Sequence, residues 1–127
     1  MKIINWFEKN PQLSWTITIL ISITIFYISS LSFPQGSPGP EFTLKPIIYH
    51  FFAFFFLNLF LMISITKGKL KNKKLILLTI LISIIYATLD EFHQYFVPGR
   101  TSTVNDVLID TLGILFSTGI YWIRLKI

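Results

Sequence analysis

The chain has 127 residues, of which 53% are hydrophobic and 13% charged, with a formal net charge of +5 and a mean hydropathy of +0.66. Because soluble domains carry roughly 25% charged residues, this composition indicates a single membrane domain over residues 1–127 and argues against a soluble one. The absence of cysteine excludes disulfides, thiolate metal ligands and cysteine nucleophiles.

Residues 1–12 form an amphipathic lead-in whose aromatic residues, Trp6 and Phe7, suit a membrane interface. An uncharged run follows from residue 13 to residue 33, which matches the roughly 20 residues that a helix needs to cross the hydrocarbon of a bilayer. The run is too long for the apolar region of a secretory signal, and no small-residue cleavage site follows it. It therefore predicts a retained transmembrane helix.

A turn-rich linker at residues 34–40 separates this first span from a second uncharged span over residues 46–66. Lys45 directly precedes the second span, and His50 lies about one helical turn inside it. The aromatic residues from 49 to 56 are most simply a lipid-facing or helix-packing surface. A loop that contains five lysines then leads to a third span over residues 75–95.

The third span is apolar as far as Leu89 and ends in a polar segment that contains Asp90, Glu91, His93 and Gln94. Because successive helical residues are about 100° apart, we expect Asp90 and Gln94 to share one face, with Glu91 and His93 flanking it.

A Pro-Gly pair at residues 98–99 predicts a tight turn before the fourth span, over residues 103–123. Thr103 and Asp106 resemble a capping box that begins this helix. Asp110 and Gly113 continue the face that Asp106 begins, and Gly113 with Ser117 gives a small-residue surface suited to close helix contact.

The distribution of basic residues predicts the topology. Nine Lys and Arg residues lie in the two terminal segments and the lysine loop, whereas the two opposite loops hold only Lys45 and Arg100. The positive-inside rule then predicts an all-α polytopic membrane protein with four transmembrane helices and both termini in the cytoplasm. This grouping of lysines also argues against nucleic-acid binding. The lipid bilayer is the expected partner.

Four of the six acidic residues, together with His93 and Arg100, lie between residues 90 and 113. Placing ionisable side chains within the membrane costs free energy, so we predict that this segment contains the functional site. Carboxylates gathered in a pocket of low dielectric must be paired, protonated or bound to a cation. A divalent metal ion is one candidate cofactor, with His93, Asp90 and Asp110 as candidate ligands beside His50.

Two further interpretations remain open. Glu91, His93 and Asp90 are candidate acid/base residues toward a lipid-linked substrate, whose phosphate or carboxylate Arg100 and Lys45 would hold. The structural alternative has Arg100 and Lys45 neutralising acidic partners, with Asp106 as a helix cap. The residues that we expect to bind substrate are Lys45, His50, Gln94, Arg100, Asp106 and Asp110.

The segment from residue 90 to residue 113, D-E-F-H-Q-Y-F-V-P-G-R-T-S-T-V-N-D-V-L-I-D-T-L-G, resembles the VanZ-like family of small bacterial membrane proteins. The acidic pair, His-Gln, Pro-Gly-Arg, the Asp that opens the last helix and the later Gly all match the family pattern. Lys45 and His50 resemble the family's Lys-x-x-x-x-His entry to the second span. One departure is Asp110, where many relatives are expected to carry Asn. This change adds a negative charge and favours a cation or proton partner.

The resemblance implies a multi-pass protein of the bacterial cytoplasmic membrane, in a family named after a member that lowers susceptibility to teicoplanin. We expect an outward-facing pocket that binds an envelope lipid, a lipid-linked precursor or a lipophilic glycopeptide. The alternative is a membrane-embedded hydrolase or transferase, with or without a metal, acting on a lipid-linked substrate. The resemblance does not decide between a binding protein and an enzyme.

Overall fold

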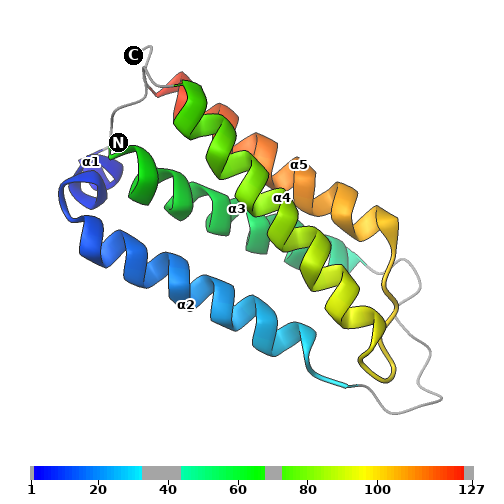
Figure 1. Ribbon diagram of the computed structural model, residues 1–127. Coiled ribbons are helices and arrows are strands. Elements are labelled where there is room, and N and C mark those ends of the chain that lie inside the picture. The colour runs from blue at the N-terminus through cyan, green and yellow to red at the C-terminus, as the bar shows by residue number, and fades with distance from the viewer. Residues whose placement is uncertain (1, 33–43, 68–72, 125–127) are drawn as a thin grey trace.

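A computed structural model describes residues 2–32, 44–67 and 73–124, and these residues form five helices and no strand. The helices are α1 (Lys2–Lys9), α2 (Pro11–Ser29), α3 (Leu44–Thr66), α4 (Lys73–Tyr95) and α5 (Val104–Ile123) (Figure 1). The four helices from α2 to α5 are long and apolar enough to cross a membrane, which confirms the four predicted spans. α1 is a short helix at the N-terminal end of the bundle.

Helix α2 ends at Ser29, four residues before the predicted end of the first span. Its Pro11 occupies the first turn, where a missing N–H costs nothing. At the other end, the guanidinium of Arg100 donates to the carbonyl oxygens of Ile28 and Leu31. The Ile28 carbonyl also accepts the backbone N–H of Leu31 at 3.2 Å, so Arg100 adds a cationic cap from the α4–α5 loop to the end of α2.

The turn between α4 and α5 is the predicted Pro-Gly turn. The backbone N–H of Arg100 donates to the carbonyl of Val97 at 3.2 Å, and Gly99 has a φ of 78°. A positive φ at the third residue of such a turn, after a proline, is the geometry of a type II turn. The turn brings the start of α5 back to the end of α4.

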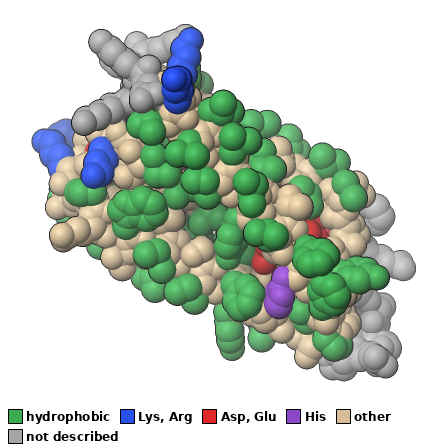
Figure 2. All heavy atoms as spheres, in the orientation of Figure 1, with side chains coloured by type: hydrophobic (Ala, Val, Ile, Leu, Met, Phe, Trp, Pro, Cys, Tyr) green, Lys and Arg blue, Asp and Glu red, His purple; other side chains and the backbone are tan. Residues whose placement is uncertain are grey.

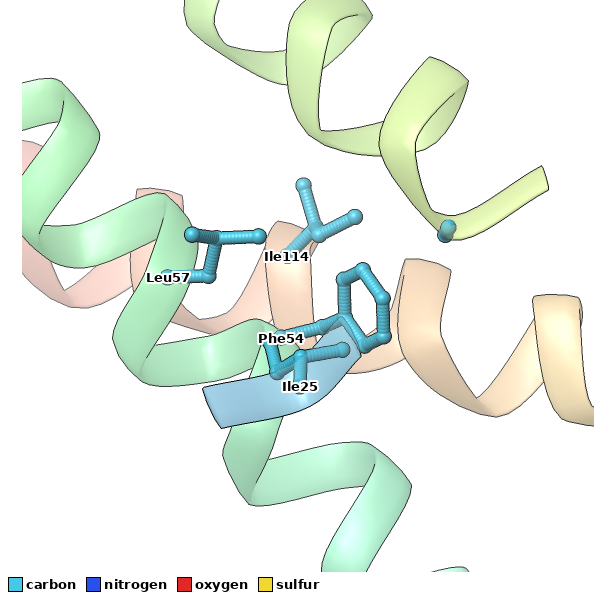
Figure 3. Close-up of a cluster of buried hydrophobic side chains, with 5 residues drawn as sticks. Ile25, Phe54, Leu57 and Ile114 are labelled. Atoms are coloured by element: carbon cyan, nitrogen blue, oxygen red, sulfur yellow. The ribbon is translucent and has the colours of Figure 1, made fainter. Parts of the chain in front are cut away.

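Helix α3 lies at the centre of the bundle and contacts each of the other four helices (Figure 1). Side chains from α2, α3, α4 and α5 meet in an apolar layer of five residues, and Figure 3 shows four of them pointing toward one another. This first layer consists of Ile25, Phe54, Leu57, Ala87 and Ile114. A second layer, nearer the α1 end, contains Met62, Ile63, Ile76 and Tyr121.

The outer surface is largely apolar, as expected for helices surrounded by lipid. In Figure 2 the visible Lys and Arg side chains gather at the end of the bundle that carries the termini, whereas acidic and histidine atoms show through the apolar surface toward the opposite end.

Candidate functional site

Three ionisable side chains from three different helices meet inside the bundle. His50 lies near the start of α3, Glu91 near the end of α4 and Asp110 near the start of α5, and one donor atom from each lies within 4.8 Å of the others. The Nδ1 atom of His50 is 3.0 Å from Oδ1 of Asp110 and 4.0 Å from Oε1 of Glu91. We call these three residues the acidic centre. All three are buried, with Asp110 fully so.

The acidic centre is closed on its inner side by the first apolar layer. One helical turn farther into the bundle from His50, Glu91 and Asp110 lie Phe54, Ala87 and Ile114, and all three are at most 1% exposed. The centre therefore sits at the end of the bundle where α2 and α4 end and α3 and α5 begin, opposite α1.

Asp90 and Gln94 extend the acidic centre toward α2. The Gln94 amide donates to Oδ2 of Asp90 at 2.9 Å and to Oε1 of Glu91 at 3.3 Å. The Ser29 hydroxyl donates to Oδ1 of Asp90 at 2.6 Å, so both Asp90 oxygens accept hydrogen bonds. This confirms the shared face of Asp90 and Gln94, and it shows that Asp90 joins α4 to the end of α2.

The α4–α5 loop holds Glu91 in place. The backbone N–H of Thr103 donates to Oε2 of Glu91 at 3.3 Å, and the Ser102 hydroxyl donates to the Glu91 carbonyl oxygen at 2.7 Å. Thr103 also caps α5, because its Oγ1 accepts the Asp106 N–H at 3.3 Å and donates to Oδ2 of Asp106 at 2.7 Å. The predicted Thr103–Asp106 cap is confirmed. In a capping box the N–H of the N-cap residue bonds to a side chain of the same helix, whereas here the Thr103 N–H bonds to Glu91 of α4.

Two buried oxygen atoms near the start of α3 and α5 have no hydrogen-bond partner among the described residues. They are Oδ2 of Asp110 and the hydroxyl of Tyr49. The Tyr49 ring packs edge-on against the His50 imidazole, with ring centroids 5.6 Å apart. A buried polar atom normally has a partner, so these two atoms distinguish the acidic centre from the satisfied polar contacts around Asp90.

The remaining predicted site residues lie around the acidic centre and not in it. His93 faces α2, with Nε2 3.0 Å from the Ser30 hydroxyl and its ring stacked on Phe26. Arg100 caps α2, and Asp106 caps α5. The side chain of Lys45 lies outside the described residues. The structure thus gathers His50, Glu91 and Asp110, and it does not bring His93 to them.

Asn58 forms a buried polar hub between the two apolar layers, which the sequence analysis missed. Its amide nitrogen donates to the carbonyl of Ile114 and to the hydroxyls of Ser117 and Thr118, and its Oδ1 accepts from Ser83. One side chain of α3 thereby joins α4 and α5. Its sequence signal was available, since Asn58 is the one amide in an uncharged apolar span.

A second missed cluster joins α1 to the end of α5. Arg124 donates to both carboxylate oxygens of Glu8, at 2.7 and 2.8 Å, and to the amide oxygen of Asn5. The Tyr121 hydroxyl donates to Oε1 of Glu8 at 2.7 Å. Burial alone would raise the pKa of Glu8, but the hydrogen bonds from Arg124 and Tyr121 outweigh it and hold this pKa below its ordinary value.

An apolar groove of about 500 Å³ lies between α2 and α3. Its walls include Ile17, Ile21, Ile25, Tyr49, Phe52 and Phe56. Its lining includes Tyr49, the chain neighbour of His50, whereas the three residues of the acidic centre are not among its lining residues. A hydrocarbon chain is the kind of group that such a surface accepts.

Four apolar helices around a buried ionic centre define a multi-pass α-helical membrane protein. The family model VanZ/LLP1 matches residues 5–125, nearly the whole chain, and the protein belongs to this family. No curated protein matches the chain. No solved structure matches it either.

Proposed function

We propose that this VanZ-family protein binds an amphipathic molecule of the bacterial cell envelope. The observation that carries the proposal is the apolar groove between α2 and α3, whose lining residue Tyr49 packs edge-on against His50 of the acidic centre. A hydrocarbon chain would lie in the groove, and the polar head of the same molecule would reach the acidic centre. Envelope lipids, lipid-linked precursors and lipophilic glycopeptides all share this division into chain and head.

The charge of the acidic centre determines which polar head groups the site would bind. Asp90, Glu91 and Asp110 place three carboxyl groups at one end of the bundle, and Ser29, Gln94 and His50 contact them. A head that carries an ammonium group or several hydroxyls would donate hydrogen bonds to such a surface. A head that is purely anionic would be repelled unless a cation came with it.

The proposed orientation places both termini in the cytoplasm and the acidic centre toward the outer face of the cytoplasmic membrane. Among the described residues, Lys2, Lys9, Lys73, Lys74 and Arg124 lie toward the end of the bundle that carries the termini. Arg100 lies at the opposite end, beside the acidic centre. The positive-inside rule supports this orientation.

Photocrosslinking tests the binding proposal. The probe is a phosphatidylethanolamine with a diazirine on one acyl chain, added to the purified protein in nanodiscs and mapped by peptide mass spectrometry. Ala53 lines the groove, so Ala53→Trp would fill it, and Leu115→Trp adds the same bulk on an exposed part of α5. We expect labelling of α2 and α3 in the wild type and in Leu115→Trp, with a loss of about tenfold in Ala53→Trp.

The proposal is overturned if Ala53→Trp is labelled like the wild type, or if labelling is spread evenly over all four long helices. Competition by teicoplanin in the same assay distinguishes a glycopeptide ligand from a lipid. A glycopeptide site would lose the lipid label when teicoplanin is added, whereas a site for lipid alone would keep it.

A membrane-embedded hydrolase or transferase is the second candidate function. The favouring observation is the His50–Asp110 pair, in which a carboxylate orients an imidazole at 3.0 Å, an arrangement suited to acid/base chemistry. A catalytic role predicts that Glu91→Gln gives a folded, inserted protein without activity. A structural role predicts that the same change lowers the amount of protein in the membrane.

A further inference from the structure

We infer that the acidic centre is a binding site for a divalent transition-metal ion, with His50, Glu91 and Asp110 as its ligands. One donor atom from each residue lies within 4.8 Å of the other two, and the three come from three different helices. A bound ion would therefore join α3, α4 and α5 at the end of the bundle.

The hydrogen-bond pattern of Asp110 points to a ligand beyond His50. Its side chain is fully buried, yet Oδ2 has no hydrogen-bond partner among the described residues, while Oδ1 faces Nδ1 of His50 at 3.0 Å. Leaving half of a buried carboxylate without a partner is costly, and a metal ion would remove that cost. By contrast, both oxygens of the neighbouring Asp90 accept hydrogen bonds.

The charge balance agrees with a dication. Glu91 and Asp110 bring two acidic groups to a buried position, and the imidazole of His50 lies against both of them. A divalent ion would neutralise both carboxylates and leave His50 as a neutral nitrogen ligand.

The donor set indicates which ions fit. An imidazole nitrogen with two carboxylate oxygens suits Zn²⁺ or Mn²⁺, and three protein ligands leave an open position for water or another molecule. Glu91 is already oriented by hydrogen bonds from the Thr103 N–H and from Gln94, as the ligands of metal sites commonly are. The α4–α5 loop therefore serves as the outer support of the site.

This inference does not rest on the proposed lipid binding, because the metal is measured directly and without any lipid probe. The protein is purified without chelators or a histidine tag, dialysed against Zn²⁺ or Mn²⁺, and then analysed for metal content. We expect about one ion per chain in the wild type. His93→Ala is the matched control, since this histidine lies at the same end of the bundle but faces Ser30 and Phe26.

Asp110→Asn and Glu91→Gln preserve the size of each side chain while removing its charge, and we expect either change to weaken metal binding by about tenfold or more. His93→Ala should keep the wild-type metal content. The inference is overturned if the wild type takes up neither ion, if the two carboxamide variants bind as much as the wild type, or if His93→Ala loses the metal.

A second measurement keeps the inference testable even if the carboxamide variants do not fold. The chain has two histidines, so in His93→Ala the remaining imidazole is that of His50. Pulsed electron paramagnetic resonance on the Cu²⁺-loaded His93→Ala protein should then show modulation from one imidazole nitrogen, and Zn²⁺ should displace it. Binding of Cu²⁺ without imidazole modulation would overturn the assignment of His50 as a ligand.

Discussion

A Cβ atom built on Gly113 would collide with the carbonyl oxygen of Phe51, so α5 and α3 are in backbone contact at this point. Phe51 directly follows His50 in α3, and Gly113 lies about one turn after Asp110 in α5. The contact between the two helices therefore lies beside the His50–Asp110 pair and sets how closely these side chains approach.

Gly113→Ala should destabilise the protein by about 1–3 kcal/mol, because the added methyl group meets backbone atoms that cannot move aside as a side chain would. The matched control is Gly119→Ala on the same helix, where a Cβ would meet nothing within 4 Å. That control should be neutral or stabilising by up to about 1 kcal/mol, since alanine favours helix. Unfolding by SDS in mixed micelles compares the two. Equal stability of both variants would contradict the close contact.

The sequence predicted the four long helices because each is an apolar segment of membrane-spanning length, a property that depends on local composition alone. The Pro-Gly turn and the Thr103 cap were also predicted, since both follow from residue types at fixed short spacing. The early end of α2 was not predicted, because it depends on Arg100, which lies about seventy residues farther along the chain.

The candidate site was predicted in its residue types but not in its grouping. Helical periodicity placed Asp90 and Gln94 on one face, and the structure confirms this. It could not show how α4 is rotated relative to its neighbours, so His93 was chosen as the acid/base and metal candidate and His50 was placed among the substrate-binding residues. The structure turns His93 toward Ser30 of α2 and places His50 against Asp110 of α5.

Asn58→Ala should destabilise the bundle by about 1–2 kcal/mol, because it removes hydrogen bonds that join α3 to α4 and α5. Thr88→Ala is a suitable control, since the Thr88 hydroxyl is exposed and bonds within its own helix. SDS unfolding of both variants provides the measurement. If Asn58→Ala is no less stable than Thr88→Ala, the hub contributes nothing to the association of the helices.

The proposed orientation predicts which loops react from outside the cell. Because the chain has no cysteine, a single introduced cysteine can be labelled without background. Thr101→Cys in the exposed α4–α5 loop should react with a membrane-impermeant maleimide in intact cells. Asn10→Cys, between α1 and α2, should react after permeabilisation and not before it. The reverse pattern would place the acidic centre toward the cytoplasm.

The Glu8 cluster predicts a stability that falls in acid. The folded-state pKa of Glu8 lies below its ordinary value, so the carboxylate's stabilisation is fully present above the unfolded pKa of about 4.3 and is lost as pH falls through the folded value. Glu8→Gln should therefore be less stable than the wild type at neutral pH, and this difference should shrink below about pH 4. Thermal unfolding across the pH range measures it. A difference that stays constant down to acid pH would show that Glu8 acts through packing and not through its charge.

Arg100 and Asp106 should contribute independently to stability, because they contact different helix ends. Arg100 donates to carbonyl oxygens at the end of α2, and Asp106 bonds with Thr103 at the start of α5. A double-mutant cycle with Arg100→Ala and Asp106→Ala should be additive to within about 0.5 kcal/mol. A second cycle with Thr103→Ala and Asp106→Ala is the control, and it should show a coupling of about 1 kcal/mol, as expected for a helix cap. SDS unfolding of the single and double variants measures both cycles. Coupling between Arg100 and Asp106 as large as that in the control would instead favour the ion-pair interpretation, in which Arg100 neutralises the start of α5 and locks the last two helices together.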